Sequence, residues 1–114
     1  MSYDVFVFAA STKAQHVAGV ALDGIDHESI DPLVRARFGE TLETHGYARA
    51  GGDDVVARFE HSEFGIGVSI RESEVSFSAP FGDATFEALM TASEICGSEP
   101  GLALFDPQVG EWNE

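Results

Sequence analysis

The sequence predicts a single α+β domain over residues 1–114, a two-layer sandwich in which a mainly antiparallel sheet carries two helices on one face. Neighbouring segments in the middle of the chain alternate apolar with small polar residues, and two other segments carry residues that start and stop helices. Of the 114 residues, 44% are hydrophobic, which is enough for one core. The expected order is β-α-β-β-β-α-β, which is ferredoxin-like or related.

The chain opens with an expected strand at residues 3–10, whose valines and phenylalanines place apolar side chains on both faces. That pattern is typical of a central strand covered on both sides. Residues 11–30 leave the secondary structure open. Ser11 or Thr12 could begin a short helix, but Gly19 and the β-branched valines on either side of it disfavour one.

A first clear helix is expected at residues 31–45. Asp31 suits the N-cap, Pro32 suits the first helical position, and Gly46 suits the end. Gly39 lies inside this helix, where glycine is unfavourable, so we expect the helix to approach the sheet closely there. The expected apolar stripe is Val34, Phe38 and Leu42.

Three strands are expected next, at residues 54–60, 64–71 and 74–79, joined by short polar hairpin connections. The second and third alternate with period two, as antiparallel strands with one buried face do. The glycine pair at Gly51 and Gly52 predicts a turn before them.

A second helix is expected at residues 83–96, with Asp83 as its cap and Gly97 as its end. A final strand at residues 102–105 precedes a possible short return at residues 109–112. The helix face expected to pack on the sheet comprises Phe86, Leu89, Met90, Ser93 and Cys96.

Charge is the feature that says most about partners. Twenty acidic residues face six basic ones, and the formal net charge is -14. Such a surface repels nucleic acids and anionic membranes and attracts basic proteins. The acid excess has three interpretations, namely a solvated surface, adaptation to high salt, and an acidic face that binds a basic partner. The sequence leaves all three open.

The expected location is the cytoplasm. Cys96 is the single cysteine and cannot form an internal disulfide, as in proteins of reducing compartments. The apolar run near the N-terminus is too short to span a membrane, and no basic segment precedes it as in a signal peptide. We expect Cys96 to be a buried structural residue.

Motifs for catalysis, cofactor binding and metal binding are missing from the sequence, so we expect a protein that is not an enzyme and carries no cofactor or metal. The histidines lack metal-ligand spacing; they are His16, His27, His45 and His61. A candidate acidic loop lacks the spacing of a calcium-binding loop; it comprises Asp23, Asp26, Glu28 and Asp31. The alternative is a small hydrolase or isomerase that combines Asp and His residues from separated segments.

A candidate interaction face lies on the polar side of the central strands. Glycine and serine leave a sheet low in relief, so that another backbone or sheet can approach closely. An ordinary solvated face and a contact surface are both open interpretations; the arginines would suit an acidic group or a second copy of the chain. This face comprises Arg58, Gly65, Gly67, Ser69, Arg71, Ser76 and Ser78.

The two ends of the chain resemble small bacterial α+β proteins. Residues 2–8 (SYDVFVF) form the opening strand, and residues 104–112 (LFDPQVGEW) form a closing strand and turn. Some of these proteins resemble immunity proteins, which neutralise toxins. The resemblance therefore implies an immunity-type inhibitor, and together with the acidic surface it leads us to expect a non-catalytic module that binds a basic partner protein. The main alternative is a homodimeric structural protein that associates through the Gly/Ser-rich sheet face.

Overall fold

Seven strands and three α-helices are present in the computed structural model, which describes residues 2–52 and 56–113. The strands are β1 Tyr3–Ala9, β2 Ala48–Gly52, β3 Ala57–His61, β4 Ile66–Ile70, β5 Glu74–Ala79, β6 Leu102–Asp106 and β7 Glu111–Asn113. The helices are α1 Ala10–Val17, α2 Pro32–Thr44 and α3 Asp83–Ser98, with a short 3-10 turn, η1, at Leu22–Gly24. This is the predicted α+β class, with α1, β2 and β7 added to the expected order.

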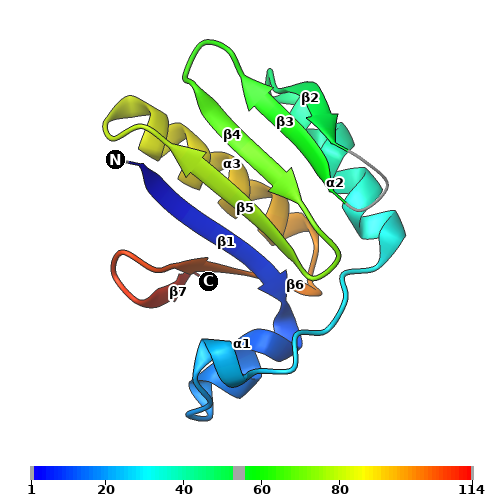
Figure 1. Ribbon diagram of the computed structural model, residues 1–114, viewed down its shortest axis with the longest axis vertical. Coiled ribbons are helices and arrows are strands. Elements are labelled where there is room, and N and C mark those ends of the chain that lie inside the picture. Colours follow the sequence, from blue (N-terminus) through cyan, green and yellow to red (C-terminus); the bar gives the residue numbers. More distant parts are fainter. Residues whose placement is uncertain (1, 53–55, 114) are drawn as a thin grey trace.

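The sheet has the strand order β2-β3-β4-β5-β1-β6-β7, and every neighbouring pair is antiparallel. Strands β2 to β5 follow one another as a meander, and β1 lies between β5 and β6 (Figure 1). This interior position agrees with the apolar residues on both faces of β1. It also brings residues from the two ends of the chain side by side, because β1 pairs with β6. Phe6 pairs with Phe105, and the Tyr3 hydroxyl donates to the Asp106 carboxylate.

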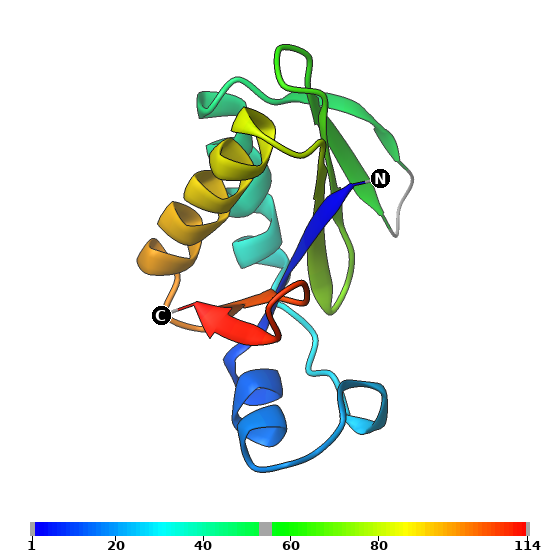
Figure 2. The ribbon, with the colours of Figure 1, turned by 90° about the vertical axis from the view of Figure 1, so that its left-hand side faces the viewer.

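Helices α2 and α3 lie on one face of the sheet, as Figure 2 shows. The α1–η1 lobe, residues 10–24, lies beyond the end of β1 (Figures 1 and 2). The core fills the space between the two helices and the sheet. Its most deeply buried side chains include Val5, Val7, Phe38, Leu42, Ile66, Val68, Val75, Phe77, Ile95 and Leu104.

Helix α2 forms as predicted. The Asp31 carboxylate accepts the Leu33 backbone N–H at 2.8 Å, which satisfies one of the free donors of the first turn. Phe38 and Leu42 are buried in the core. A side-chain carbon at Gly39 would lie 3.0 Å from Phe59 Cζ, so glycine lets the helix backbone approach the ring on the sheet, as expected.

Helix α3 exists, and the prediction of its buried face is correct only in part. Leu89 and Cys96 are half-buried and pack against the core, but the prediction is wrong for Phe86 and Met90. Phe86 and Met90 are 69% and 50% exposed. The fully buried face of the helix consists mainly of small residues instead. The cap prediction is also wrong, since Gly82 holds the cap position and Asp83 is the first helical residue. The buried residues of α3 are Ala84, Ala88, Thr91, Ala92 and Ile95.

Strand β2 was not predicted. It contains Gly51 and Gly52, which were expected to form a turn, and its pairing with β3 is irregular between Arg49 and Gly51. All five of its residues are exposed, so an edge strand of this kind carries no alternating apolar signal. The start of the strand predicted at residues 54–60 lies outside the described residues, and the strand found there is β3.

The remaining expectations near the sheet hold with shifted ends. Gly65, expected within a strand, lies in the turn before β4 with φ +67°, a conformation that favours glycine. The final strand is β6, and the short return is β7. Within the described ranges, none of the helices combines the length and apolar composition that crossing a membrane requires.

Candidate functional site

The candidate site is the open face of the sheet, meaning the side of strands β3, β4, β5 and β1 that is turned away from α2 and α3. Alternation along each strand sends every second side chain to this face, and the register aligns these side chains in rows across the sheet. One row crosses the sheet from β3 to β7 and consists of Arg58, Ser69, Ser76, Phe6, Phe105 and Trp112. The neighbouring row consists of Glu60, Gly67, Ser78 and Asp4.

A shallow hollow of about 290 Å³ lies in the open face over β3, β4 and β5. Small side chains form its floor, and a side-chain carbon at Gly67 would meet no atom within 4 Å. The structure thus brings together five residues of the predicted interaction face, which are Arg58, Gly67, Ser69, Ser76 and Ser78.

The other two predicted members of that face lie at its margins. Arg71 follows β4 and directs Nη1 toward Ser76 Oγ at 3.5 Å. Gly65 lies in the β3–β4 turn, where it lines a different hollow with His61 and Ser62. The sequence pattern placed Gly65 with Gly67 because every second residue of a strand lies on the same face. The strand begins only at Ile66, however, so Gly65 is not part of it.

A second pocket, which we call the aromatic pocket, opens at the β1–β6 end of the open face beside η1. It has a volume of about 330 Å³. The rings of Phe6 and Phe8 stack with centroids 6.0 Å apart, and the ring of His27 lies 5.2 Å from that of Phe8. The lining residues are Phe6, Phe8, Leu22, Asp23, His27, Glu74, Phe105 and Pro107.

Sequence reasoning missed the aromatic pocket. It assigned Phe6 and Phe8 to a doubly covered core strand, and it assigned Asp23 and His27 to a solvated acidic loop. The signal that could have found it is the second apolar face of the first strand, which needs a cover that α2 and α3 cannot supply. The α1–η1 lobe supplies only part of that cover, and Phe6 stays half-buried.

The structure brings together only two of the four members of the candidate acidic loop, because Glu28 and Asp31 line one hollow of about 260 Å³ and Asp23 and Asp26 do not line it. The Asp31 side chain caps α2, Glu28 accepts the Ser11 hydroxyl at 3.2 Å, and Asp23 lines the aromatic pocket. Asp26 is exposed and offers its backbone carbonyl to Gln15 at 3.3 Å. Among the described residues, no three His, Cys, Asp or Glu side chains are grouped to hold a metal ion.

The histidines serve separate contacts. His16 accepts a hydrogen bond from Trp112. His27 Nε2 donates to the Leu22 carbonyl at 3.1 Å, and His45 lies 3.3 Å from Glu94. His61 is buried, with its ring perpendicular to that of Tyr47 at 5.0 Å.

Cys96 is half-buried on α3 and packs against the core. Burial raises the pKa of its thiol to about 12, because the low-dielectric surroundings disfavour the charged thiolate. A cysteine nucleophile acts as the thiolate, so this side chain is poorly suited to covalent catalysis.

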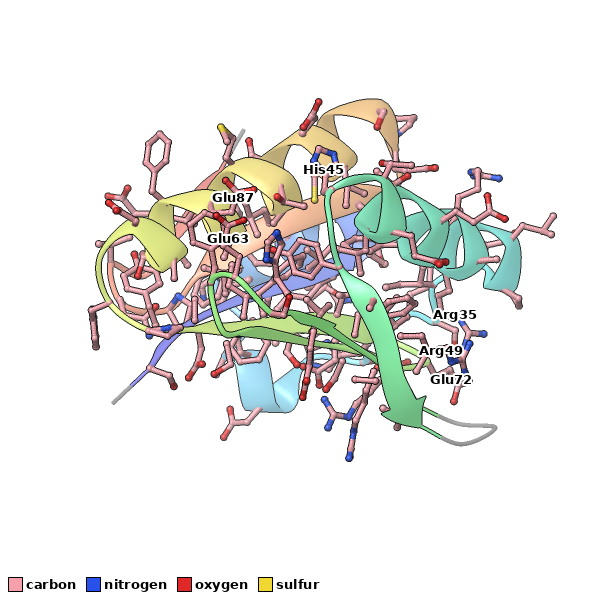
Figure 3. All side chains as sticks on the ribbon, turned by 90° about the horizontal axis from the view of Figure 1, so that it is seen from above. Arg35, His45, Arg49, Glu63, Glu72 and Glu87 are labelled. Carbon is pink, nitrogen blue, oxygen red and sulfur yellow. The ribbon has the colours of Figure 1, made fainter. Side chains whose placement is uncertain are left out.

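Charge is distributed unevenly over the molecule. In the view of Figure 3, Arg35, Arg49 and Glu72 gather toward one end, whereas Glu63 and Glu87 lie toward the other. Every described Asp and Glu is exposed or half-buried. Their negative charges can therefore attract cationic molecules from solution.

Comparisons with known proteins found no relative of this chain. The chain matches no protein-family model, no curated protein and no solved structure.

Proposed function

We propose that this protein is a non-catalytic binding module that engages a basic partner protein through the open face of its sheet. An immunity-type inhibitor, which covers and neutralises a basic protein, is the concrete form of the proposal. One observation carries it. A sheet face that α2 and α3 do not cover, with a floor of small residues, adjoins an aromatic pocket on a chain whose formal net charge is -14.

The low relief of the open face and the negative charge of the protein both support this function. The floor at Gly67, Ser69 and Ser76 lets the backbone of a partner approach the sheet closely. The aromatic side chains beside it provide the buried contact area that commonly dominates binding free energy. The acidic surface would attract a basic protein and speed its association at low salt.

A homodimer through the same face is the competing function. The opposite charges of Arg58 and Glu60, which are two residues apart on β3 and lie on the same face of the sheet, could pair across a twofold axis. Two chains that each carry a formal charge of -14 repel each other, however, and this repulsion weakens as salt shortens the Debye length. Self-association is therefore expected to strengthen with salt, whereas capture of a basic protein is expected to weaken.

A pull-down from host extract at low and high salt tests the proposal. The bait is the wild-type chain, with Gly67→Arg as the variant that fills the hollow. Gly97→Arg on α3 is the matched control, because a side chain there also enters open space but lies on a helix rather than the open face. We expect the wild-type chain and the control to recover a basic protein at low salt, and Gly67→Arg to lose it.

Two outcomes contradict the proposal. One is recovery of the same basic protein by Gly67→Arg and by wild type in equal amounts. The other is a concentration-dependent dimer in sedimentation that Gly67→Arg abolishes, with no basic protein recovered. The second outcome supports the homodimer.

A small hydrolase or isomerase is the second candidate function, because His27 shares the aromatic pocket with Asp23 and Glu74. The Leu22 carbonyl orients the imidazole through Nε2, which leaves Nδ1 as the nitrogen that accepts a proton in this tautomer. Turnover in a broad substrate screen that is lost in His27→Ala would support this function over the binding module.

Two finer expectations complete the proposal. We infer a sandwich related to the ferredoxin-like fold, supported by α2 and α3 on one face of the sheet; the β2–β5 meander and the α1–η1 lobe extend the expected order. We also infer a cytoplasmic location, supported by the single cysteine.

A further inference from the structure

We propose that the aromatic pocket binds an arginine side chain, presented by the basic partner protein. This inference rests on the proposed function and names the contact that would make the partner specific. It follows from the aromatic side chains that line the pocket, from the two carboxylates beside them, and from the volume of the pocket.

Four of the eight residues that line the pocket carry aromatic rings, and they are Phe6, Phe8, His27 and Phe105. Phe6 and Phe8 are stacked with an interplanar angle of 21°, and Phe105 pairs with Phe6 on the neighbouring strand. His27 tilts against Phe8 at 37° and is held there by the Leu22 carbonyl. The faces of phenylalanine rings are negative, so they attract a cation placed over them.

Two carboxylates accompany these rings. Glu74 pairs with Phe8 across β1 and β5 and is half-buried, and Asp23 is exposed on η1. Arg71, which follows β4, donates its backbone N–H to the Glu74 carbonyl at 2.8 Å. Its guanidinium lies beside Ser76 at 3.5 Å, in the direction of the shallow hollow.

The chemistry selects a cation with an apolar stem. An anion would be repelled by Asp23 and Glu74, and a neutral apolar group would remove water from these carboxylates without pairing them. A guanidinium can lie flat on a phenylalanine ring and donate to a carboxylate at the same time, which a compact ammonium does less well. A volume of about 330 Å³ lies at the small end of the range for ligand pockets and is large enough to hold one long side chain.

The direct test is an NMR titration of the full isotope-labelled chain with N-acetyl-L-arginine amide. N-acetyl-L-citrulline amide is the neutral probe of nearly the same shape. We expect the arginine probe to shift the ring signals of Phe6, Phe8 and Phe105, and the citrulline probe to bind at least about five-fold more weakly. Equal shifts from both probes, or no shift of these rings, would overturn the assignment.

Charge-neutral variants locate the site. The double substitution Asp23→Asn with Glu74→Gln should weaken the arginine probe about five-fold or more. Glu60→Gln is the matched control, because it removes one carboxylate from the open face outside the aromatic pocket. Circular dichroism confirms that each variant is folded. A loss of binding in the control equal to that in the double variant would indicate a diffuse charge effect and would overturn the proposal.

The same variants separate this inference from the proposed function. If wild type and the double variant capture a basic protein equally and the rings do not respond to the probe, the pocket assignment is wrong and the proposed function stands. If the rings bind the arginine probe but no basic protein is captured at low salt, the proposed function is wrong and the arginine site is supported. Loss of both captured protein and probe in the double variant supports both.

Discussion

The indole N–H of Trp112 donates to Nδ1 of His16 at 3.0 Å, and this bond joins the last strand of the sheet to the first helix. The Trp112 ring also lies 4.9 Å from the ring of Phe105 and 6.0 Å from that of Phe8. Residues that are 96 positions apart in the sequence therefore hold the α1–η1 lobe against β6 and β7. The lobe in turn carries Leu22 and Asp23 of the aromatic pocket.

Trp112→Phe should loosen this attachment. The substitution keeps an aromatic ring but removes the N–H, so we expect a loss of about 1 kcal/mol in the free energy of unfolding. Backbone amides of α1 should exchange faster with deuterium than in wild type, while those of α3 stay unchanged. Val109→Ala is the control, since Val109 is exposed in the same C-terminal segment. Unchanged exchange in α1 would show that the hydrogen bond does not hold the lobe.

Phe38→Ala and Phe86→Ala should differ sharply although both remove a phenyl ring from a helix. Phe38 is 1% exposed in the core, and its loss should lower the free energy of unfolding by about 3–5 kcal/mol. Phe86 is mostly exposed, so its replacement should change the free energy of unfolding by less than about 0.5 kcal/mol. Urea denaturation of both variants makes the comparison. Equal losses would contradict the observed orientation of α3.

Gly39→Ala should stabilise the protein less than Gly97→Ala does, although both replace a helical glycine. Alanine generally gains up to about 1 kcal/mol over glycine inside a helix, with less near the end. At Gly97 the new carbon meets no atom within 4 Å, whereas at Gly39 it would lie 3.0 Å from the buried Phe59 ring. Thermal unfolding of the two variants tests the order. A larger gain at position 39 would mean that α2 does not press on the sheet there.

Glu99 should contribute to stability in a pH-dependent way. The hydrogen bond from Arg37, at 2.8 Å, holds the pKa of Glu99 below its ordinary value; burial opposes this shift and the charge of Arg37 adds to it. A lowered pKa in the folded state stabilises the protein above the ordinary pKa of a glutamate, and this contribution is lost as the pH falls through the lowered pKa.

Denaturation of Glu99→Gln and wild type at several pH values measures this contribution. We expect the variant to be slightly less stable at neutral pH and the difference to vanish in acid. Glu43→Gln, an exposed position on α2, serves as the control and should show no such convergence. A difference between Glu99→Gln and wild type that grows as the pH falls would contradict the direction of the shift.

The Cys96 thiol should resist modification in the folded protein. With its pKa raised to about 12 by burial, it carries little thiolate near neutral pH. A thiol reagent should therefore label native Cys96 at least about a hundred-fold more slowly than it labels the unfolded chain. A new cysteine made by Ser98→Cys, at the exposed end of α3, provides a rapidly labelled reference in the Cys96→Ser background. Labelling of native Cys96 at the rate of that reference would contradict its burial.

Local sequence signals were reliable where one side of an element is buried and its ends carry specific residues. Asp31 and Pro32 placed the start of α2, and the alternation after Gly65 placed β4 and β5. Each of these signals reflects a contact made within a few residues, such as the Asp31 carboxylate with the Leu33 N–H. No information from distant parts of the chain is needed to recognise them.

The orientation of α3 could not be predicted in the same way. Phe86 and Met90 form an apolar stripe at helical spacing, and so do the small residues Ala88 and Ala92. Hydrophobicity favours the large pair for burial, but in the structure the small pair is buried and the large pair is exposed. The choice between the two faces depends on the volume left in the core, which only packing determines.

By itself, the sequence determined the α+β class, the interior strand β1, helix α2 with its close approach at Gly39, and the small floor of the open face. Only the tertiary structure decided the edge strand β2, the outward position of Phe86 and the aromatic pocket. The spacing of hydrophobic residues and the capping residues of helices are local properties of the chain, and they can be recognised without its tertiary structure. The pocket instead needs Phe8, Asp23 and Glu74 to meet, and that meeting depends on strand register and on the attachment of the α1–η1 lobe by Trp112.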